Sequence, residues 1–412
     1  MAFDYKETKK REKATDRVQQ VEDFLKEHYD VKINVFDASK TLIVAKNKDL
    51  YKSEIKFVDL SLHMEREGLR GCDSTLKKIL ASQNQITTFN PITEYLEGLK
   101  GQWKGVSHID KLCNHIEVRD FGDKTKTYYP DRLRYVLRKY LAACVANSLN
   151  QIPNEAMLGF ICAKEGIGKT RLIKFLTPKL LKPYYIQSSK DDRFDMTAAF
   201  AQNFFINFDE LWGITKHNSE QVKQTTSANE YHLSRRDTNA VPRYGNGVFT
   251  SNKSQEMGGF LHPQMGHRRW AAIELESINW KAYSVEVDVD QIWAEAYVLF
   301  NNADFDFTWN ETDFAEFEEY NTRYLVETHA YRLIKENYRV PTAEDDPEKI
   351  AFKQPQEMLM ELRSRRKITT AMSDVSDVTI GLALKALGFT REMKKVNKIL
   401  PRYGYNVISL FE

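Results

Sequence analysis

A short glycine-bounded stretch, residues 166–170 (GIGKT), has the residue types and spacing needed to bind phosphate. Glycines let a backbone turn so that its N–H groups point at phosphate oxygens, and a helix that follows adds the positive end of its dipole. Lys169 would then reach the β- and γ-phosphates of a nucleotide, and the Thr170 hydroxyl would bind Mg²⁺. The complete phosphate-loop pattern begins with glycine, where this chain has Ala163. The candidate nucleotide-binding residues are Gly166, Ile167, Gly168, Lys169, Thr170 and Arg171.

Two adjacent carboxylates, Asp209 and Glu210, follow the short apolar run at residues 203–208 (NFFINF). A carboxylate at the end of a buried strand can hold Mg²⁺, directly or through water. The glutamate beside it can polarise the water molecule that attacks the γ-phosphate. Because this run lies one expected strand and helix beyond the phosphate loop, we predict that Thr170 and Asp209 bind the metal and that Glu210 is catalytic.

Another apolar run, residues 247–251, ends in the amide side chain of Asn252. In an ATPase core this strand would lie beside the strand that precedes Asp209. Asn252 could then hydrogen-bond the attacking water or the γ-phosphate, which makes it a catalytic candidate. A strand that runs into an ordinary turn at residues 252–254 is the alternative interpretation.

Two arginines, Arg268 and Arg269, precede the strand-like residues 271–275. An arginine finger stabilises the charge of a transferring phosphoryl group and can contribute about 10³ to 10⁵ in rate. A finger of this kind usually reaches the site of a neighbouring subunit, so this interpretation implies a ring. A basic pair on the surface explains the same two residues.

Residues 231–245 alternate polar and apolar side chains around a turn candidate at residues 237–239, which predicts a β-hairpin. Its arginines are interleaved with His232 and Tyr244, and this combination suits phosphate contact and base stacking on a single strand. Residue content alone leaves nucleic-acid contact and a structural role equally open. The candidate DNA-binding residues are His232, Arg235, Arg236 and Arg243.

Strand and helix patterns surround the phosphate loop in the order that its chemistry requires. Residues 157–162 are an apolar run typical of a buried strand, and residues 169–176 have helical spacing. A second strand is expected at residues 184–189 and a helix at residues 195–202. Alternating strands and helices predict an α/β core with a parallel sheet.

Smaller domains are expected around this core. The N-terminal part mixes helical and strand patterns, including a short strand through Leu60, Leu62 and Met64. A strong helical pattern at residues 130–149 predicts a collar that leads into the core. The expected division is a mixed α/β domain (1–88), a helical collar (89–150), the ATPase core (151–300), a helical lid and linker (301–350) and a winged-helix-like DNA-binding domain (351–412).

The C-terminal domain is expected to contain helices at residues 356–365 and 378–387 and a strand at residues 405–411. Residues 361–412 carry ten lysines and arginines against five acidic residues. This local excess of positive charge favours DNA contact over a neutral packing role.

The 412-residue chain has a net charge of +2 and 42% hydrophobic residues, so any basic surface must be local and the cores can be large. No apolar run approaches the roughly 18 residues that span a bilayer, and residues 1–17 lack the apolar centre of a signal peptide. We therefore expect a cytoplasmic protein. The four cysteines form no Cys-x-x-Cys pair, so neither a zinc site nor a disulfide framework is indicated.

With these elements in order, the chain resembles the virulence-associated protein E family, ATPases related to superfamily 3 helicases and poxvirus-type primase-helicases. The resemblance covers about residues 90–276 and is carried by AKEGIGKT, FFINFDEL, YHLSRRD with VPRYG, FTSN and MGHRRWAAIEL. It implies an AAA+-like core that assembles into hexameric rings around DNA and couples ATP hydrolysis to strand translocation. Members are often found on phages, plasmids and genomic islands.

Carried onto this sequence, the resemblance makes Lys169 and Thr170 the Walker A pair and makes Asp209 and Glu210 the Walker B pair. Asn252 becomes the sensor of the γ-phosphate.

The resemblance also makes Arg268 or Arg269 the arginine finger and makes the region of Arg235 and Arg236 the pore hairpin that grips DNA. Many relatives carry a primase domain upstream, for which this chain has little room, so a separate primase is a possible partner.

The sequence thus predicts a DNA-stimulated ATPase of the superfamily 3 helicase kind, using ATP and Mg²⁺ on single-stranded or forked DNA in the replication of a mobile element. A replication initiator or regulatory DNA-binding protein that uses nucleotide only as an assembly switch is the alternative, although Glu210 together with Asn252 argues against it. A small-molecule kinase would share the loop but would leave the arginine-rich hairpin unexplained.

Overall fold

The computed structural model describes residues 5–36, 42–46, 55–80, 82, 87–188, 194–211, 219–233, 240–261, 266–369, 372–396 and 400–411. The chain divides into two compact units, Met1–Gly98 and Leu99–Glu412. Both combine helices with sheets, which confirms the predicted mixed α/β class. No described helix has the length and apolar content needed to cross a membrane.

The N-terminal unit, Met1–Gly98, combines helices with a small sheet. A three-stranded sheet in the order β2-β1-β3 is accompanied by helices. Strands β1 and β2 are antiparallel, and β1 and β3 are parallel. The elements are α1 (Tyr5–His28), β1 (Tyr29–Asn34), β2 (Leu42–Ala45), α2 (Phe57–Arg66), α3 (Asp73–Leu80), β3 (Thr87–Phe89) and α4 (Pro91–Glu97).

The strand predicted through Leu60, Leu62 and Met64 is wrong, because these residues belong to helix α2. Leu60 and Met64 are buried and lie one helical turn apart, whereas Leu62 is 47% exposed. The apolar residues at 60 and 64 satisfy a helical repeat as well as an alternating one. Packing against the rest of the domain selected the helix over the strand.

A six-stranded sheet forms the centre of the second unit, in the order β4-β11-β5-β10-β7-β6. The last five strands of this order are parallel, and β4 pairs antiparallel with β11 at the edge. Strands β5, β7 and β10 are completely buried, which explains their near-continuous apolar sequences. Their bounds are β4 (Ile116–Val118), β5 (Met157–Ile161), β6 (Tyr185–Gln187), β7 (Phe205–Phe208), β10 (Asn246–Ser251) and β11 (Trp270–Ile278).

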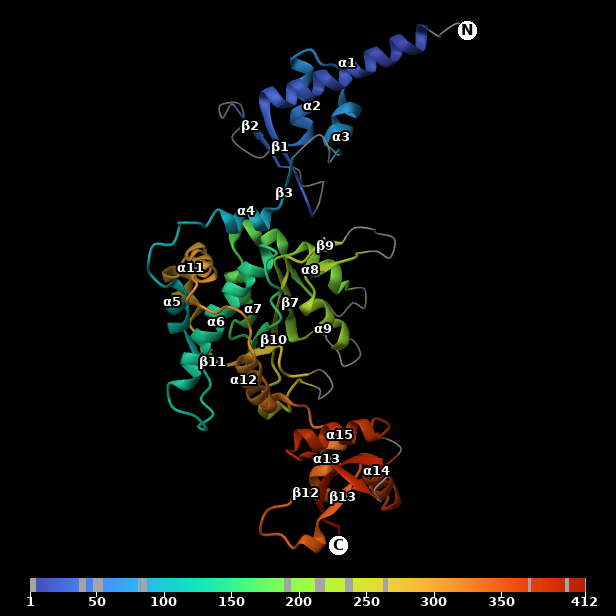
Figure 1. Ribbon diagram of the computed structural model, residues 1–412. Coiled ribbons are helices and arrows are strands. Elements are labelled where there is room, and N and C mark those ends of the chain that lie inside the picture. Colours follow the sequence, from blue (N-terminus) through green and yellow to red (C-terminus); the bar gives the residue numbers. More distant parts are fainter. Residues whose placement is uncertain are drawn as a thin grey trace. The chain divides into compact units, whose positions relative to one another are not determined.

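Helices cover both faces of this sheet (Figure 1). Figure 1 shows α6 and α11 on one side and α8 and α9 on the other. A core cluster joins Phe200 of α8, Phe249 of β10 and Trp270 of β11 to Tyr320 of α12. The helices of this unit's core are α5 (His108–Asn114), α6 (Tyr128–Ser148), α7 (Lys169–Leu176), α8 (Met196–Gln202), α9 (Ser219–Ser227), α10 (Trp280–Glu286), α11 (Val289–Asn301) and α12 (Glu311–Asn321).

The collar predicted for residues 89–150 is not a separate layer, and this prediction is corrected. Residues 116–118 add strand β4 to the central sheet. Helix α6 packs on that sheet: the Tyr140 hydroxyl donates to Gly247 O at 2.7 Å, and Asn147 Nδ2 donates to Gly245 O at 3.0 Å. The apolar stripe that predicted α6 therefore faces the core itself.

The lid predicted for residues 301–350 is divided between two domains. Helix α12 belongs to the core, because the buried Lys139 ammonium of α6 bonds to the buried Asp313 carboxylate at 2.6 Å. Helix α13 (His329–Asn337) belongs to the C-terminal domain, since Ala330, Leu333 and Ile334 lie in that domain's own core cluster.

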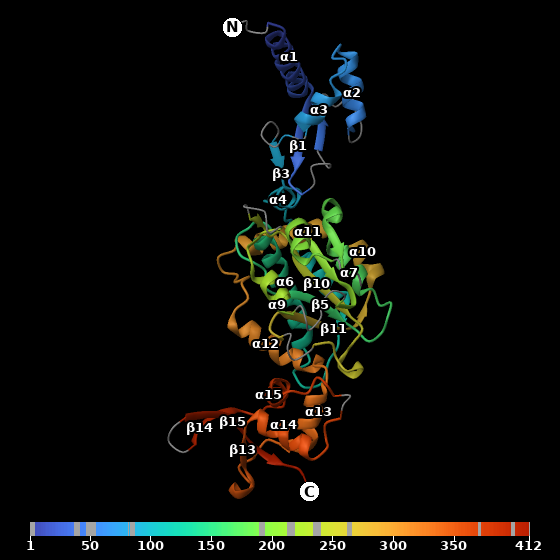
Figure 2. The same ribbon diagram turned by 90° about the vertical axis from the view of Figure 1, so that its right-hand side faces the viewer.

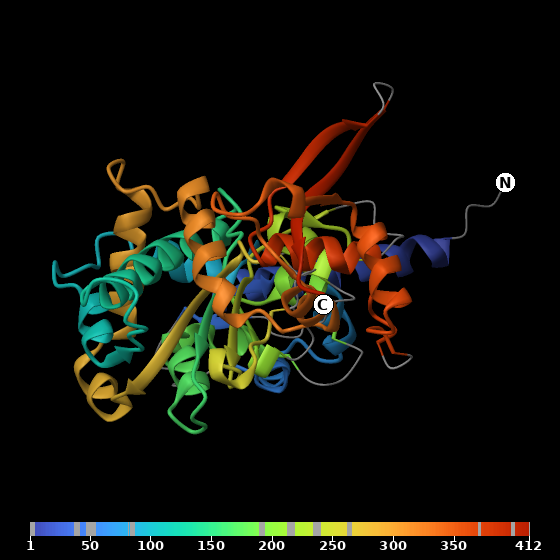
Figure 3. The same cartoon turned by 90° about the horizontal axis from the view of Figure 1, so that it is seen from below.

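The C-terminal domain combines three helices with a four-stranded sheet in which β15 pairs with β12, β13 and β14 (Figure 2). The predicted helices at 356–365 and 378–387 are confirmed. The predicted strand at 405–411 is the second half of a longer strand. The elements besides α13 are β12 (Tyr338–Arg339), β13 (Ala351–Lys353), α14 (Pro355–Ser364), α15 (Asp377–Ala386), β14 (Arg391–Val396) and β15 (Leu400–Ser409). Figure 3 shows the β14–β15 hairpin extending away from the helices of this domain.

Candidate nucleotide-binding site

The loop between β5 and α7 has the backbone that the glycine pattern predicts. Gly166 and Gly168 have positive φ angles of 75° and 104°, a region that side chains other than glycine rarely adopt. No atom lies within 4 Å of where a Cβ would project from either glycine, so the loop borders open space. Gly168 is the N-cap of α7, and the helix begins at Lys169 with its positive dipole end at the loop.

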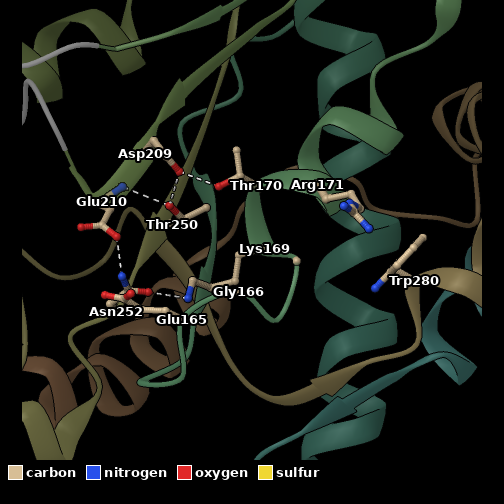
Figure 4. A pocket seen from close by; sticks show the side chains of 11 residues that line it. Glu165, Gly166, Lys169, Thr170, Arg171, Asp209, Glu210, Thr250, Asn252 and Trp280 are labelled. Atoms are coloured by element: carbon tan, nitrogen blue, oxygen red, sulfur yellow. Dashed lines mark hydrogen bonds between the residues drawn. The ribbon is translucent and has the colours of Figure 1, made fainter.

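A cavity of about 540 Å³ opens beside this loop at the carboxyl ends of the parallel strands (Figure 4). Such an edge is where open parallel sheets bind ligands, and the volume suits a small organic ligand. The cavity is lined by Glu165, Gly166, Gly168, Lys169, Thr170, Arg171, Asp209, Glu210, Thr250, Asn252 and Trp280. Most of the predicted nucleotide, metal and catalytic residues are therefore brought together.

The carboxylate of Asp209 is the centre of one hydrogen-bond cluster in this cavity. Its Oδ1 accepts hydrogen bonds from the hydroxyls of Thr170 and Thr250, each at 2.7 Å. Its Oδ2 accepts a hydrogen bond from Gln187 Nε2, also at 2.7 Å. Carboxylate and hydroxyl oxygens are ligands that Mg²⁺ prefers, so Thr170 and Asp209 are the residues that would hold a magnesium ion here.

Glu210 has a left-handed backbone, with φ 50° and ψ 27°, immediately after β7. Such a conformation costs a residue other than glycine about 1–3 kcal/mol and persists where surrounding contacts determine it. One such contact is the hydrogen bond from Glu210 N to Thr250 Oγ1 at 3.0 Å. Asn252 Nδ2 donates to the Glu210 carboxylate. The backbone thus turns the carboxylate into the cavity beside Asn252 (Figure 4).

The Lys169 ammonium lies 2.6 Å from Asn252 Oδ1 and also donates to the carbonyl oxygens of Cys162 and Lys164 at 3.1 and 3.4 Å. Only 8% of Lys169 is exposed, and burial lowers the pKa of its side chain. The prediction that the strand ending at Asn252 lies beside the strand ending before Asp209 is confirmed by the pairing of β10 with β7.

Within one subunit, Arg268 and Arg269 lie far from this cavity. They immediately precede Trp270, which pairs with Met157 at the start of β5, whereas the phosphate loop follows the end of β5. The two arginines are therefore at the opposite edge of the sheet. Arg269 donates to Ser227 Oγ at 2.7 Å and to Glu155 Oε2 at 3.3 Å, while Arg268 is exposed. Neither can act on a nucleotide in its own subunit.

The hairpin predicted at residues 231–245 is present at its base, where β8 (Glu230–Tyr231) pairs antiparallel with β9 (Val241–Pro242). His232 is exposed just beyond β8. Arg235 and Arg236 lie outside the described residues.

The prediction that Arg243 contacts DNA is wrong, because only 1% of this residue is exposed. Its guanidinium donates to the carbonyl oxygens of Gly245, Thr226 and Asn154 at 3.1, 2.5 and 2.8 Å. It also lies 5.1 Å from the ring centroid of Phe200. Arg243 thus connects its own segment to Thr226 of α9 and to Asn154, which residue type and hairpin pattern could not reveal.

Sequence reasoning missed three residues of the cavity and its border: Thr250, Gln187 and Trp280. Thr250 belongs to the motif FTSN, but a threonine in a buried strand does not by itself indicate a functional residue. Gln187 ends β6 at the same edge as Asp209, a signal available only once the strand order is known. Trp280 had no signal in the sequence.

Fold and site together define an α/β domain with a mostly parallel sheet, a glycine-bounded loop before α7 and two adjacent carboxylates at the carboxyl edge of the sheet. The family model of the virulence-associated protein E-like domain matches residues 96–326, more than half of the chain. The chain belongs to this family. The resemblance expected for about residues 90–276 is thereby confirmed and extended to include α10, α11 and α12.

Solved structures with some likeness include the apo structure of the NrS-1 C-terminal region (305–718) and an inhibitor-bound JCV helicase. The first is 11% identical, covers 96% of this chain and 99% of its own, and has a TM-score of 0.44. The second is 10% identical, covers 79% and 83%, and has a TM-score of 0.28. Among curated proteins, none matches. Since both TM-scores are below 0.5, the assignment rests on the family match.

Proposed function

We propose that this protein is an ATP-dependent DNA helicase or translocase of the superfamily 3 type. It would bind ATP and Mg²⁺ in the cavity beside the phosphate loop and act in the replication of a phage, plasmid or genomic island. The observation that carries the proposal is the convergence of Lys169, Thr170, Asp209, Glu210 and Asn252, from the start of one helix and the ends of two strands, on a single cavity. Membership of the virulence-associated protein E-like family supports it.

Each of these side chains has a part in hydrolysis. The loop amides and the Lys169 ammonium bind the β- and γ-phosphates, so Lys169 would leave Asn252 when a nucleotide arrives. Thr170 and Asp209 hold the metal, which neutralises charge on the phosphate oxygens when bound. Glu210 takes a proton from the attacking water, and Asn252, its hydrogen-bonded neighbour, orients that water.

Hydrolysis in this proposal needs a second subunit. Arg268 and Arg269 are at the sheet edge opposite the cavity, so a finger must come from a neighbouring copy in a homo-oligomeric ring, which the family resemblance makes hexameric. Arg268 is the better candidate, because Arg269 is already bonded to Glu155 and Ser227. An exposed guanidinium can enter another subunit's site without breaking internal hydrogen bonds.

Two parts of the chain would contact DNA. The segment between β8 and β9, whose sequence contains His232, Arg235 and Arg236, would grip a single strand in the ring. The C-terminal domain, as a winged-helix-like unit, would add a second contact through its excess of positive charge.

A nucleotide-switched replication initiator is the second candidate. It is favoured by the C-terminal domain, which has its own core cluster and a basic composition suited to DNA binding without translocation. Such a protein would bind ATP to assemble and would hydrolyse it independently of DNA.

The test is the ATP hydrolysis rate of the purified protein with and without single-stranded DNA, with Glu210→Gln as control. The proposal expects a severalfold rise with DNA and loss of activity in the control. A rate that DNA leaves unchanged, in a protein that binds DNA, would overturn the motor and favour the initiator. Strand displacement on a forked substrate then separates unwinding from simple translocation.

A further inference from the structure

One end of the nucleotide cavity is aromatic, formed by the first residue of α10. Trp280 lines the cavity and is 39% exposed, whereas Trp270 and Trp293 of the same unit are 2% and 0% exposed. Of these three tryptophans, Trp280 is therefore the one whose ring a ligand in the cavity can contact. Its place beside the phosphate loop limits which ligand that can be.

Arg171 connects this ring to the phosphate-binding loop. Its guanidinium carbon lies 4.0 Å from the centroid of the Trp280 ring. Arg171 directly follows Thr170 in α7, so the aromatic end and the metal end of the cavity are joined by adjacent residues of one helix. Lys281 Nζ is 5.8 Å from the same ring and adds a second cation. The surroundings of the ring therefore attract an anionic ligand.

The position of Trp280 is set by packing. Asn279 caps α10 by accepting a hydrogen bond from Ala282 N at 3.3 Å. Tyr283, which is 1% exposed, packs its ring 4.6 Å from that of Phe175 in α7. Because α10 is held against the helix that carries Thr170 and Arg171, Trp280 is presented to the cavity at a defined place.

The cavity thus has two chemically different ends. Figure 4 shows Thr170, Asp209, Glu210 and Asn252 on one side and Arg171 with Trp280 on the other. A nucleotide has the same division, with a polyphosphate that needs cations and metal and a flat base that stacks on aromatic rings.

We propose that Trp280, held by Arg171, is the stacking platform for the base of the bound nucleoside triphosphate. This inference rests on the proposed function, and it names the side chain that makes the site select a nucleotide over a bare polyphosphate. Stacking on an indole does not read the edges of a base, so ATP and GTP bind comparably. CTP and UTP bind more weakly, because a pyrimidine covers less of the ring.

The test compares Mg²⁺-dependent binding of ATP and of inorganic tripolyphosphate by calorimetry in wild type, Trp280→Ala and Trp280→Phe. Base stacking is worth about 1–3 kcal/mol, so Trp280→Ala is expected to weaken ATP binding about 5- to 150-fold. Tripolyphosphate affinity stays unchanged, and Trp280→Phe keeps most of the ATP affinity. Thermal melting checks that each variant is folded.

A second readout uses ATP carrying a methylanthraniloyl group on its ribose, which accepts energy from a nearby tryptophan. Trp280→Phe should remove most of the transfer, and Trp103→Phe, a change outside the cavity lining, should not. The inference is overturned if Trp280→Ala leaves ATP affinity intact, or if it lowers ATP and tripolyphosphate affinity equally.

Different results would overturn the proposed function and the proposed base platform. Wild-type protein that binds neither ATP nor tripolyphosphate overturns nucleotide binding and the base platform together. Base-dependent binding through Trp280 without DNA-stimulated hydrolysis overturns the motor and leaves the platform in place.

Discussion

Asn252 Oδ1 accepts a hydrogen bond from Lys169 Nζ at 2.6 Å, and the amide nitrogen of the same side chain donates to Glu210. One neutral carboxamide thus separates a buried ammonium from a carboxylate and satisfies both. An asparagine can do this because it carries an acceptor and a donor on one planar group. In the proposed reaction the lysine turns to phosphate, and the amide oxygen becomes free to bind the attacking water.

Asn252→Ala should therefore lower the maximal hydrolysis rate about 100-fold, the usual cost of losing one positioned polar group near a transition state. ATP binding should change little, since Lys169 is retained. Asn252→Asp should also weaken ATP binding, because a carboxylate holds Lys169 more tightly and repels Glu210. Steady-state kinetics combined with calorimetry separate the two effects. An Asn252→Ala enzyme with normal turnover would remove Asn252 from the mechanism.

Thr250 is a positioning residue between the two carboxylates. Its hydroxyl donates to Asp209 and accepts from the backbone N–H of Glu210. Thr250→Val keeps the shape of the side chain but removes both hydrogen bonds. A hydrogen bond to a charged group is worth about 1.5–3 kcal/mol, so we expect a tenfold or larger loss of turnover and a higher Mg²⁺ requirement. Thr250→Ser should restore both, and a serine variant as impaired as valine would contradict the proposed role.

Arg243 should matter for stability and not for DNA. Arg243→Met removes a hydrogen-bond donor from three buried carbonyl oxygens; that of Gly245 keeps its bond from Asn147, whereas those of Thr226 and Asn154 lose the guanidinium. Leaving a buried acceptor unsatisfied costs about 1–3 kcal/mol. Thermal denaturation should show a lower midpoint. DNA affinity, measured well below that midpoint, should equal wild type, whereas His232→Ala should weaken it without affecting melting. Normal melting with weakened DNA binding in Arg243→Met would show that the buried position is wrong.

The N-terminal unit should lose stability in acid through His63. Burial, and then the nearby His28, lower the pKa of His63 below its ordinary 6.5. The Tyr29 hydroxyl lies 2.5 Å from its Nδ1. Below pH 6.5 His63 is protonated in the unfolded chain, whereas in the folded chain it binds the proton only at a lower pH. The free energy of unfolding therefore decreases as the pH falls. Hydrogen-exchange protection factors, which correct for the intrinsic pH dependence of amide exchange, should fall in α2 and β1 between pH 7.5 and 5.5 by more than in the central sheet.

His63→Gln is the matching variant, because it keeps a hydrogen-bonding side chain that does not titrate. It should flatten this pH response, although the domain will be less stable at neutral pH. An unchanged response would assign the acid sensitivity to other groups.

In the C-terminal domain the β14–β15 hairpin, and not α15, should carry the DNA contact. Helix α15 has one acidic and one basic residue, Asp377 and Lys385, whereas the hairpin exposes Arg391, Lys394 and Arg402. Replacing Arg391 and Arg402 by alanine should weaken DNA binding for all sequences and reduce the salt slope by about 2. Lys385→Ala is the control that should leave the slope unchanged. The reverse pattern would place DNA on the helix.

The sequence by itself determined the chemistry of the site and the strands that bear it. A continuous apolar run precedes the phosphate loop, the pair Asp209 and Glu210, and Asn252. Parallel strands that are buried on both faces have such apolar sequences. Because the carboxyl ends of such strands share one edge, those residues could be expected to meet before any coordinates were known.

Only the tertiary structure decided the rest, because those features depend on contacts between segments distant in the sequence. Leu60 and Met64 fit a strand or a helix until packing selected α2. The sequence of α6 predicted a collar, but the apolar stripe of this helix packs on the central sheet. Arg243 is of a type that is usually exposed, yet it is buried and bonded to carbonyl groups of Thr226 in α9, of Asn154 and of its own segment. Trp280 became a candidate ligand contact only when α10 was packed against α7.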